Sequence, residues 1–224
     1  MLPRVILHNM VSVDGRTDWF TPDIGLYYEI ASRFDEDAML SGSNTILAMP
    51  MEEEKPEEAD QIAEPPETGA GAARRLLVVV DSRGRVQNWQ FLRKQPYWRD
   101  VVALCSGTTP QSQLEYLERE QVAYIVTGEE HVDLRAALEE LNGRYGVQVV
   151  RVDSGGILNG LLLQAGLVDE VSVLIDPSLV GGTSPRSIFT APDLASSEGV
   201  IGLKPMHLER FEGDVVWLRY EVAK

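Results

Sequence analysis

The sequence has a single cysteine, Cys105, and only three histidines among its 224 residues. One cysteine excludes an intrachain disulfide or a thiolate metal cluster, and its apolar neighbours in residues 101–105 predict a buried, reduced thiol. The histidines, His8, His131 and His207, are far apart and lack the spacing of metal ligands. We therefore expect them to have structural or surface roles, and we expect no metal site.

Positive charge is scarce as well. The chain has 20 Lys and Arg against 35 Asp and Glu, a net charge of −15. This balance argues against nucleic acid and anionic membranes as partners, and a phosphorylated ligand would need a local cluster of bases. No apolar run has the length of a membrane span, and the run near the N-terminus is too short for a signal peptide. We therefore expect a cytoplasmic protein.

The two common nucleotide-binding fingerprints are missing. The sequence Gly69-Ala70-Gly71 follows a stretch rich in Pro and Glu rather than a strand, so it does not fit the Rossmann motif. A Walker A sequence is also lacking, which argues against a kinase or an NTPase.

Length and composition indicate one globular domain, since 44% of the residues are apolar and 25% are charged. Residues 50–73 differ from the rest: they contain eight acids against Lys55 alone, together with four prolines. Because such a stretch cannot bury an apolar face, we predict a surface loop within a single domain over residues 1–224.

Elsewhere, short apolar runs alternate with segments of helical spacing. The predicted strands cover residues 4–9, 38–42, 76–81, 101–105, 123–127, 147–153 and 170–175. The predicted helices cover residues 24–34, 111–120, 132–142 and 156–165. This alternation predicts an α/β fold with a largely parallel sheet and helices on both faces. Near the end, residues 207–211 and 215–221 flank a turn and predict an antiparallel hairpin at the sheet edge.

The most informative local pattern covers residues 152–159. A predicted strand ends at Asp153, and Ser154, Gly155 and Gly156 lead into a helix. The free amides and positive dipole end of a helix favour an anion, and glycines let a diphosphate approach closely. The same pattern also occurs in ordinary strand-to-helix turns, so spacing alone leaves both interpretations open.

A second pattern follows the strand at residues 76–81, where Asp81 and Ser82 precede Arg83 and Arg85. An arginine just past a strand end can contact the 2′-phosphate of NADPH. It can equally pair with surface acids, which is the more common situation for exposed arginines.

Two further loops are predicted at strand ends. Residues 9–16 place Ser12, Asp14 and Gly15 after the first strand, and residues 42–45 follow the second. In open α/β sheets, ligands bind at the carboxyl edge, where all four of these segments are expected to meet. Each segment by itself is also compatible with a simple turn or helix cap.

In this order, the motifs resemble the dihydrofolate-reductase-like superfamily, and more closely the reductase domain of riboflavin biosynthesis. The resemblance extends over nearly the whole chain and is carried by residues 10–16, 42–45, 80–85, 155–159, 166–171 and 177–182. It implies a mixed sheet of eight or nine strands, a homodimer, and NADPH bound without a Rossmann fingerprint. It also implies hydride transfer to C1′ of a ring-opened pyrimidine ribosylamino phosphate, which turns the ribosyl group into ribityl.

Local patterns and resemblance together predict the site residues. The predicted cofactor contacts are Trp19, Gly42, Thr45, Asp81, Ser82, Arg83, Arg85, Ser154, Gly155, Gly156, Ile157 and Leu158. The predicted substrate contacts are Asn9, Ser12, Asp14, Gly15, Arg33 and Asp153. Hydride transfer requires mainly positioning, but a proton must still reach the substrate nitrogen. Asp153 and Asp14 are the candidate proton donors, with Asp153 favoured.

The sequence departs from the family pattern in the substrate half. Met49 replaces the usual acid, the acidic loop replaces a basic segment, and Ser32 replaces a phosphate-binding arginine, with Arg33 as its possible substitute. Carboxylates there would repel a substrate phosphate. Two alternatives to the riboflavin-pathway reductase therefore stay open. One is a reductase of a pterin or other non-phosphorylated molecule, and the other is a catalytically lapsed NADPH-binding sensor or scaffold.

Overall fold

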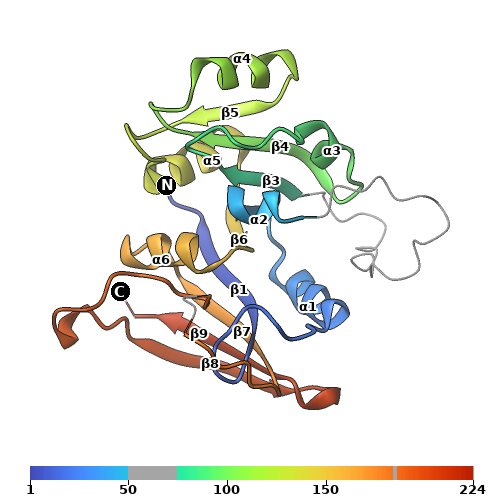
Figure 1. Cartoon of the computed structure of the whole chain (residues 1–224), viewed down its shortest axis with the longest axis vertical. Helices are drawn as coiled ribbons and strands as arrows, with labels where there is room; N and C mark the ends of the chain where they lie inside the picture. The colour runs from blue at the N-terminus through green and yellow to red at the C-terminus, as the bar shows by residue number, and fades with distance from the viewer. Residues whose placement is uncertain (50–74, 184–185, 224) are drawn as a thin grey trace.

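A nine-stranded mixed sheet organises the part of the chain that the computed structural model describes, residues 1–49, 75–183 and 186–223 (Figure 1). The strand order is β5-β4-β3-β2-β6-β1-β7-β9-β8. The strands from β5 to β7 are parallel, whereas β9 pairs antiparallel with β7 and β8 antiparallel with β9. This topology confirms the predicted mixed sheet with its C-terminal antiparallel hairpin. The predicted acidic loop at residues 50–73 lies outside the described residues.

The strands are β1 (Arg4–Ser12), β2 (Ala38–Gly42), β3 (Arg75–Val80), β4 (Trp98–Cys105), β5 (Ala123–Val126), β6 (Val149–Val152), β7 (Glu170–Asp176), β8 (Leu203–Arg210) and β9 (Val216–Val222). The α-helices are α1 (Ile24–Ala31), α2 (Ser43–Leu47), α3 (Trp89–Lys94), α4 (Gln111–Arg119), α5 (Leu134–Tyr145) and α6 (Gly156–Gln164). Short 3-10 turns cover Ser32–Phe34, Ser197–Gly199 and Glu212–Asp214. No helix within the described ranges is both long enough and apolar enough to cross a membrane.

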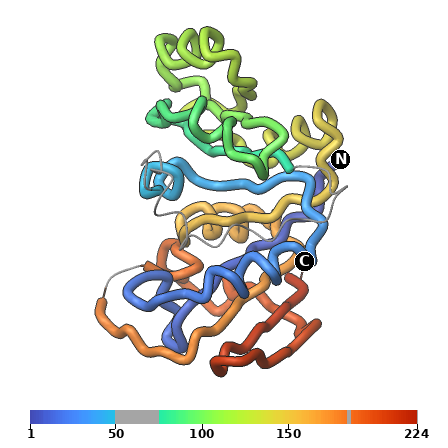
Figure 2. Tube along the Cα trace, turned by 90° about the vertical axis from the view of Figure 1, so that its right-hand side faces the viewer, coloured from blue at the N-terminus to red at the C-terminus, as the bar shows by residue number. Residues whose placement is uncertain are grey.

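Helices cover both faces of the sheet because successive strand residues point to opposite sides. In β3, Leu76 and Val78 belong to the core under α5 and α6, whereas Leu77 and Val79 belong to the core under α2, α3 and α4. A third apolar cluster packs α1 against β1, β7 and β9. Figures 1 and 2 place α4 at one end of the molecule and the β8–β9 ribbon at the other.

Two short helices and several element ends, most clearly those of β1, β4 and β8, differ from the sequence prediction. Helices α2 and α3 have five and six residues, too few to show a helical repeat in the sequence. Strand β1 continues to Ser12, so Ser12 lies in the strand rather than in the loop where it was predicted. The prediction was wrong there because pairing with β7 continues to Ser12, opposite Asp176.

Candidate active site

Ser154 joins three of the four predicted segments at the carboxyl edge of the sheet. Its hydroxyl oxygen accepts a hydrogen bond from the Gly42 amide at 3.2 Å and lies 3.4 Å from the Thr45 hydroxyl. Its carbonyl accepts from the Asn9 side chain at 2.9 Å and from Asn159 at 3.3 Å. The ends of β1, β2 and β6 therefore meet at one buried serine, as the topology of a parallel sheet requires.

The first turn of α6 is open on one side and packed on the other. Gly155 precedes the helix, and a Cβ atom built there would meet no atom within 4 Å. A Cβ atom on Gly156 would clash with the Ser187 carbonyl and with Thr190, whose amide donates to the Gly156 carbonyl at 3.0 Å. Gly155 therefore leaves room for a ligand, whereas Gly156 allows the segment with Ser187 and Thr190 to pack against the helix. Ile157 is exposed at the same turn, whereas Leu158 is buried.

In the loop after β3, Asp81 and Ser82 make hydrogen bonds within the protein. Asp81 is buried and accepts hydrogen bonds from the backbone amides of Arg85, at 3.0 Å, and Val86, at 2.8 Å. Ser82 accepts from the Val132 amide at 3.1 Å. These contacts show that Asp81 closes its own turn, although it was predicted to contact the cofactor.

The two arginines of this loop lie in different surroundings. The Arg85 guanidinium donates to the Ser43 hydroxyl at 2.8 Å and to the Asn44 side chain at 2.7 Å, and so ties the β3 loop to α2. Arg83 is exposed and has no hydrogen-bond or ion-pair partner among the described residues. Of the two, Arg83 is therefore the one available to an anionic ligand.

Asp14 holds the loop that follows β7. Its carboxylate accepts hydrogen bonds from the Ser12 hydroxyl at 2.6 Å and from the amides of Val180 and Gly181 at 3.1 and 2.6 Å. The Ser12 bond, followed by the two amide bonds, lowers the pKa of Asp14 to about 2. At neutral pH Asp14 is thus a carboxylate committed to this loop, and the geometry does not support it as a proton donor.

Trp19 lies beside the same loop in an unusual backbone conformation. Its φ is +68°, a region that bulky residues rarely adopt, and its side chain is 86% exposed. It lines a hollow of about 590 Å³ with Val180, Gly181, Gly182 and Thr183. Backbone strain of this kind often accompanies ligand contact, so an exposed, strained aromatic ring here is compatible with the predicted role.

Asp153 ends β6 directly before Ser154. Its amide donates to the Leu40 carbonyl at 3.0 Å, and its carbonyl accepts from the Ser41 hydroxyl at 2.9 Å. Its carboxylate accepts from the Arg151 guanidinium at 3.1 Å and is 25% exposed. Asp153 is therefore a fixed, partly accessible carboxylate at the point where the segments meet.

The structure does not bring Arg33 into this site. Its guanidinium donates to Glu29 at 2.9 Å and to Glu209 at 3.4 Å, and it lies over the rings of Phe211 and Trp217. These contacts turn the side chain toward the C-terminal hairpin, and its charge is balanced by two acids. Arg33 is thus not placed to substitute for the phosphate-binding arginine.

Sequence reasoning included Asn159 in the motif at residues 155–159 but missed Arg151. Asn159 is fully buried and donates to the Asn9 side chain at 2.9 Å and to the Ile188 carbonyl at 2.9 Å. Arg151 is also fully buried, inside a strand whose other residues are all valine. A lone charge in such a strand was the available signal. No group of three His, Cys, Asp or Glu in the described ranges is arranged to hold a metal ion.

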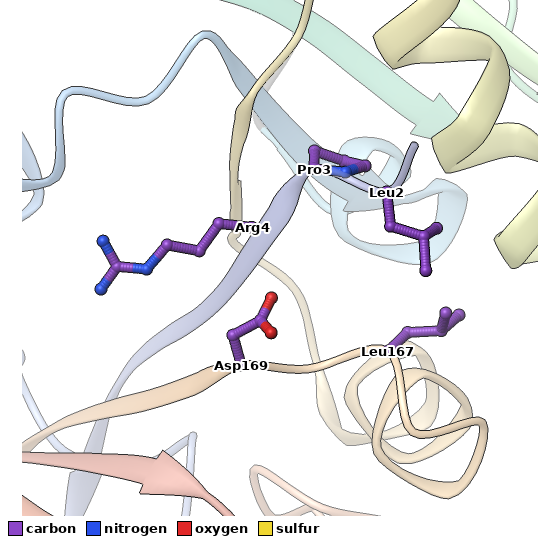
Figure 3. A pocket seen from close by; sticks show the side chains of 5 residues that line it. All are labelled: Leu2, Pro3, Arg4, Leu167 and Asp169. Atoms are coloured by element: carbon purple, nitrogen blue, oxygen red, sulfur yellow. The ribbon is translucent and has the colours of Figure 1, made fainter. Parts of the chain in front are cut away.

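A second hollow lies at the opposite, amino edge of the sheet (Figure 3). It is lined by Leu2, Pro3, Arg4, Leu167 and Asp169, and Figure 3 shows the Arg4 side chain directed away from Leu2 and Leu167. The Asp169 carboxylate accepts from the Val5 amide at 2.8 Å. Because ligands of parallel sheets bind at the carboxyl ends, the site is assigned to the edge around Ser154.

Known proteins are similar in sequence to this chain over most of its length. The chain is 29% identical over 213 residues to the 2,5-diamino-6-ribosylamino-4(3H)-pyrimidinone 5′-phosphate reductase of Methanothermobacter thermautotrophicus, and the alignment covers 91% of each. It is 31% identical over 185 residues to the protein of the same name from Archaeoglobus fulgidus, covering 80% of this chain and 76% of that one.

Solved structures show the same fold at lower identity. A pyrimidine reductase-like protein of Corynebacterium diphtheriae superposes with a TM-score of 0.75 at 15% identity, covering 99% of this chain and 92% of that one. Acinetobacter baumannii RibD superposes with a TM-score of 0.69 at 19% identity, covering 100% of this chain but 59% of RibD. Residues 3–217 match the model of the RibD C-terminal domain. Because that match includes every segment of the site, the chain belongs to the RibD C-terminal domain family, whose members use a nicotinamide cofactor.

Proposed function

We propose that this chain is a single reductase domain that uses NADPH to reduce the ribosyl group of a pyrimidine ribosylamino 5′-phosphate to ribityl in riboflavin biosynthesis. The observation that carries the proposal is the meeting of β1, β2 and β6 at Ser154, with Gly155 open at the first turn of α6. The names of the archaeal relatives support the choice of substrate.

The cofactor half of the site fits NADPH. Free amides open α6 beside Gly155, where the space around the missing Cβ lets a diphosphate approach. Exposed Arg83 is the candidate contact for the 2′-phosphate, and Arg85 supports the site indirectly by holding α2. Trp19 offers an exposed ring to a ligand in the adjoining hollow. When bound, NADPH supplies the hydride.

On the substrate side, the protein contributes orientation and a proton path. Asp153 is the acid at the Ser154 junction whose side chain is partly accessible. We assign it the task of orienting the substrate nitrogen or a water beside it, so that the proton which balances the hydride arrives there. Asp14 is not given this role, since its carboxylate already holds the loop after β7.

The proposal includes a homodimer. Strand β8 lies at the edge of the sheet, with one side of its backbone unpaired by any described strand, and Met206 and Leu208 on it are 51% and 73% exposed. An edge strand of eight residues with exposed apolar side chains favours pairing with another chain. Light scattering of the purified protein tests this: a dimer is expected, and a monomer at micromolar concentration would contradict it.

A non-phosphorylated substrate is the second candidate, because Ser32 stands at the expected arginine position and Arg33 is paired with two acids. NADPH titration followed by an oxidation assay separates the possibilities. We expect oxidation with the pyrimidine ribosylamino 5′-phosphate and little with its dephosphorylated form or with a dihydropterin. The reverse preference would favour the second candidate. NADPH binding without oxidation by any of the three compounds would reject a reductase and leave the sensor or scaffold.

A further inference from the structure

A charged side chain lies in the centre of the sheet. Arg151 belongs to β6, pairs in register with Ile6 of β1 and Met39 of β2, and its side chain is 1% exposed. A buried guanidinium is costly unless every part of it is paired. Because the neighbouring strand positions are apolar, a valine or isoleucine would fill this place without that cost. An arginine at this position therefore requires buried acidic partners that pair with its charge.

Arg151 has two partners, one on each side. Its Nε donates to Glu36 Oε1 at 3.0 Å, and its Nη1 donates to Asp153 Oδ2 at 3.1 Å. Glu36, 1% exposed, also pairs with Arg75. The charges thus form a series from Arg75 through Glu36 and Arg151 to Asp153. Asp153 is the acid at which the series reaches the candidate active site.

Two further contacts of Asp153 restrain its backbone. Strand β2 holds its amide and carbonyl through Leu40 and Ser41, which fixes the position of the Cα atom but leaves the side-chain torsions free. On the side chain, Arg151 donates a hydrogen bond to one carboxylate oxygen, and the buried Tyr27 hydroxyl interacts with the same carboxylate. Of these two groups, Arg151 is the one that carries the opposite charge. The planar guanidinium can reach Glu36 and Asp153 at once, a geometry that a lysine ammonium does not reproduce.

We infer that Arg151 is a positioning residue that holds the Asp153 carboxylate in the orientation required by the substrate, while Glu36 holds Arg151. This inference rests on the proposed reductase function and adds to it a residue that does not itself touch the substrate. A misplaced acid at a reacting centre can reduce turnover by roughly 100-fold without altering distant binding contacts.

The test compares Arg151→Lys, Asp153→Asn and the double variant with the wild type. We measure kcat and KM for the pyrimidine ribosylamino 5′-phosphate, the Kd for NADPH, and thermal unfolding. For Arg151→Lys we expect kcat to fall by roughly 10- to 100-fold while the NADPH Kd stays within about 2-fold. The double variant should be no slower than Asp153→Asn, because Arg151 acts only through Asp153. An unchanged kcat in Arg151→Lys, or additive losses in the double variant, would overturn the inference.

Arg75→Lys is the matched control, since Arg75 pairs with the same Glu36 but not with Asp153. It should lower thermal stability and leave kcat unchanged, and an equal kcat loss in Arg75→Lys would also overturn the inference.

If Arg151→Lys does not fold, Arg151→Met combined with Glu36→Met keeps the core filled with apolar side chains. That variant should show the same kcat loss with unchanged NADPH affinity. An inactive wild type would reject the proposed function and this inference together, whereas an active wild type with a fully active Arg151→Lys would reject the inference alone.

Discussion

Gly155 and Gly156 are adjacent in the sequence but have opposite surroundings. A side chain on Gly155 would enter open space, whereas one on Gly156 would collide with Ser187 and Thr190. Gly155 is the N-cap of α6 with a φ of −78°, a conformation that alanine also adopts. The pair therefore separates an open position from a packing position within two residues.

Alanine substitutions at these glycines should have different effects. We expect Gly155→Ala to fold with nearly wild-type stability but to bind NADPH at least about 10-fold more weakly, because its methyl group occupies the space assigned to the diphosphate. Gly156→Ala should lose roughly 1–3 kcal/mol of unfolding free energy through overpacking. Urea unfolding and NADPH titration of both variants measure the two effects. Wild-type NADPH affinity in Gly155→Ala would contradict the proposed position of the diphosphate.

Asp14 provides the second prediction. Asp14→Asn removes the negative charge that accepts amide bonds from Val180 and Gly181, so the loop after β7 should open more often. Hydrogen exchange at these two amides should accelerate, while exchange in the β1 core stays unchanged. Exposed Glu139 on α5 offers a control, since Glu139→Gln changes the net charge equally without touching this loop. Equal exchange rates in the two variants would contradict the role of Asp14.

The fold was predictable because its signals are local. Each buried parallel strand is a short apolar run, and the turn at Glu212–Asp214 marks the C-terminal hairpin. The meeting of strand ends was also predictable, since it follows from parallel topology. Helices α2 and α3 were not predicted because they are too short to show a periodic pattern.

The roles of individual site residues depend on contacts that are distant in sequence. Asp14 bonds to amides 166 and 167 residues away, and Arg33 pairs with Glu209, 176 residues away. Gly156 is needed because Thr190 packs on it, which no pattern around residue 156 indicates. Sequence motifs therefore predicted which segments meet at this edge of the sheet, while the contacts of each residue there required the fold.

The arginines of the β3 loop give a third prediction. Arg83→Ala should weaken NADPH binding by roughly 10-fold or more and leave NADH binding nearly unchanged, because only NADPH carries the 2′-phosphate. Arg85→Ala should weaken both cofactors to a similar extent, since it releases the start of α2 through Ser43 and Asn44. Fluorescence titration with the two cofactors distinguishes these patterns. Equal losses for NADPH and NADH in Arg83→Ala would reject its assignment to the 2′-phosphate.

His8 gives the last prediction, which concerns stability rather than catalysis. Its ring is fully buried between β1 and α1, with Nδ1 at 2.9 Å from the Ser172 hydroxyl and Nε2 at 3.2 Å from the Tyr27 carbonyl. Ser172 also accepts from the Trp217 indole at 2.8 Å, which leaves its own proton for Nδ1. This network assigns a neutral ring protonated on Nε2. Burial, followed by the nearby charge of Arg151, lowers the pKa of His8 from 6.5 to about 3.

Because the folded pKa lies below the unfolded value, the unfolded chain binds the additional proton between about pH 6.5 and 3. The contribution of His8 to stability is therefore complete above pH 6.5 and declines as the pH falls, by up to about 1.4 kcal/mol per pH unit. Urea unfolding at pH 7, 6 and 5 should show this decline in the wild type and a shallower one in His8→Gln. Exposed His131 provides the control, and His131→Gln should keep the wild-type slope. If His8→Gln lost stability as steeply as the wild type, the neutral buried ring would not be the source of the acid sensitivity.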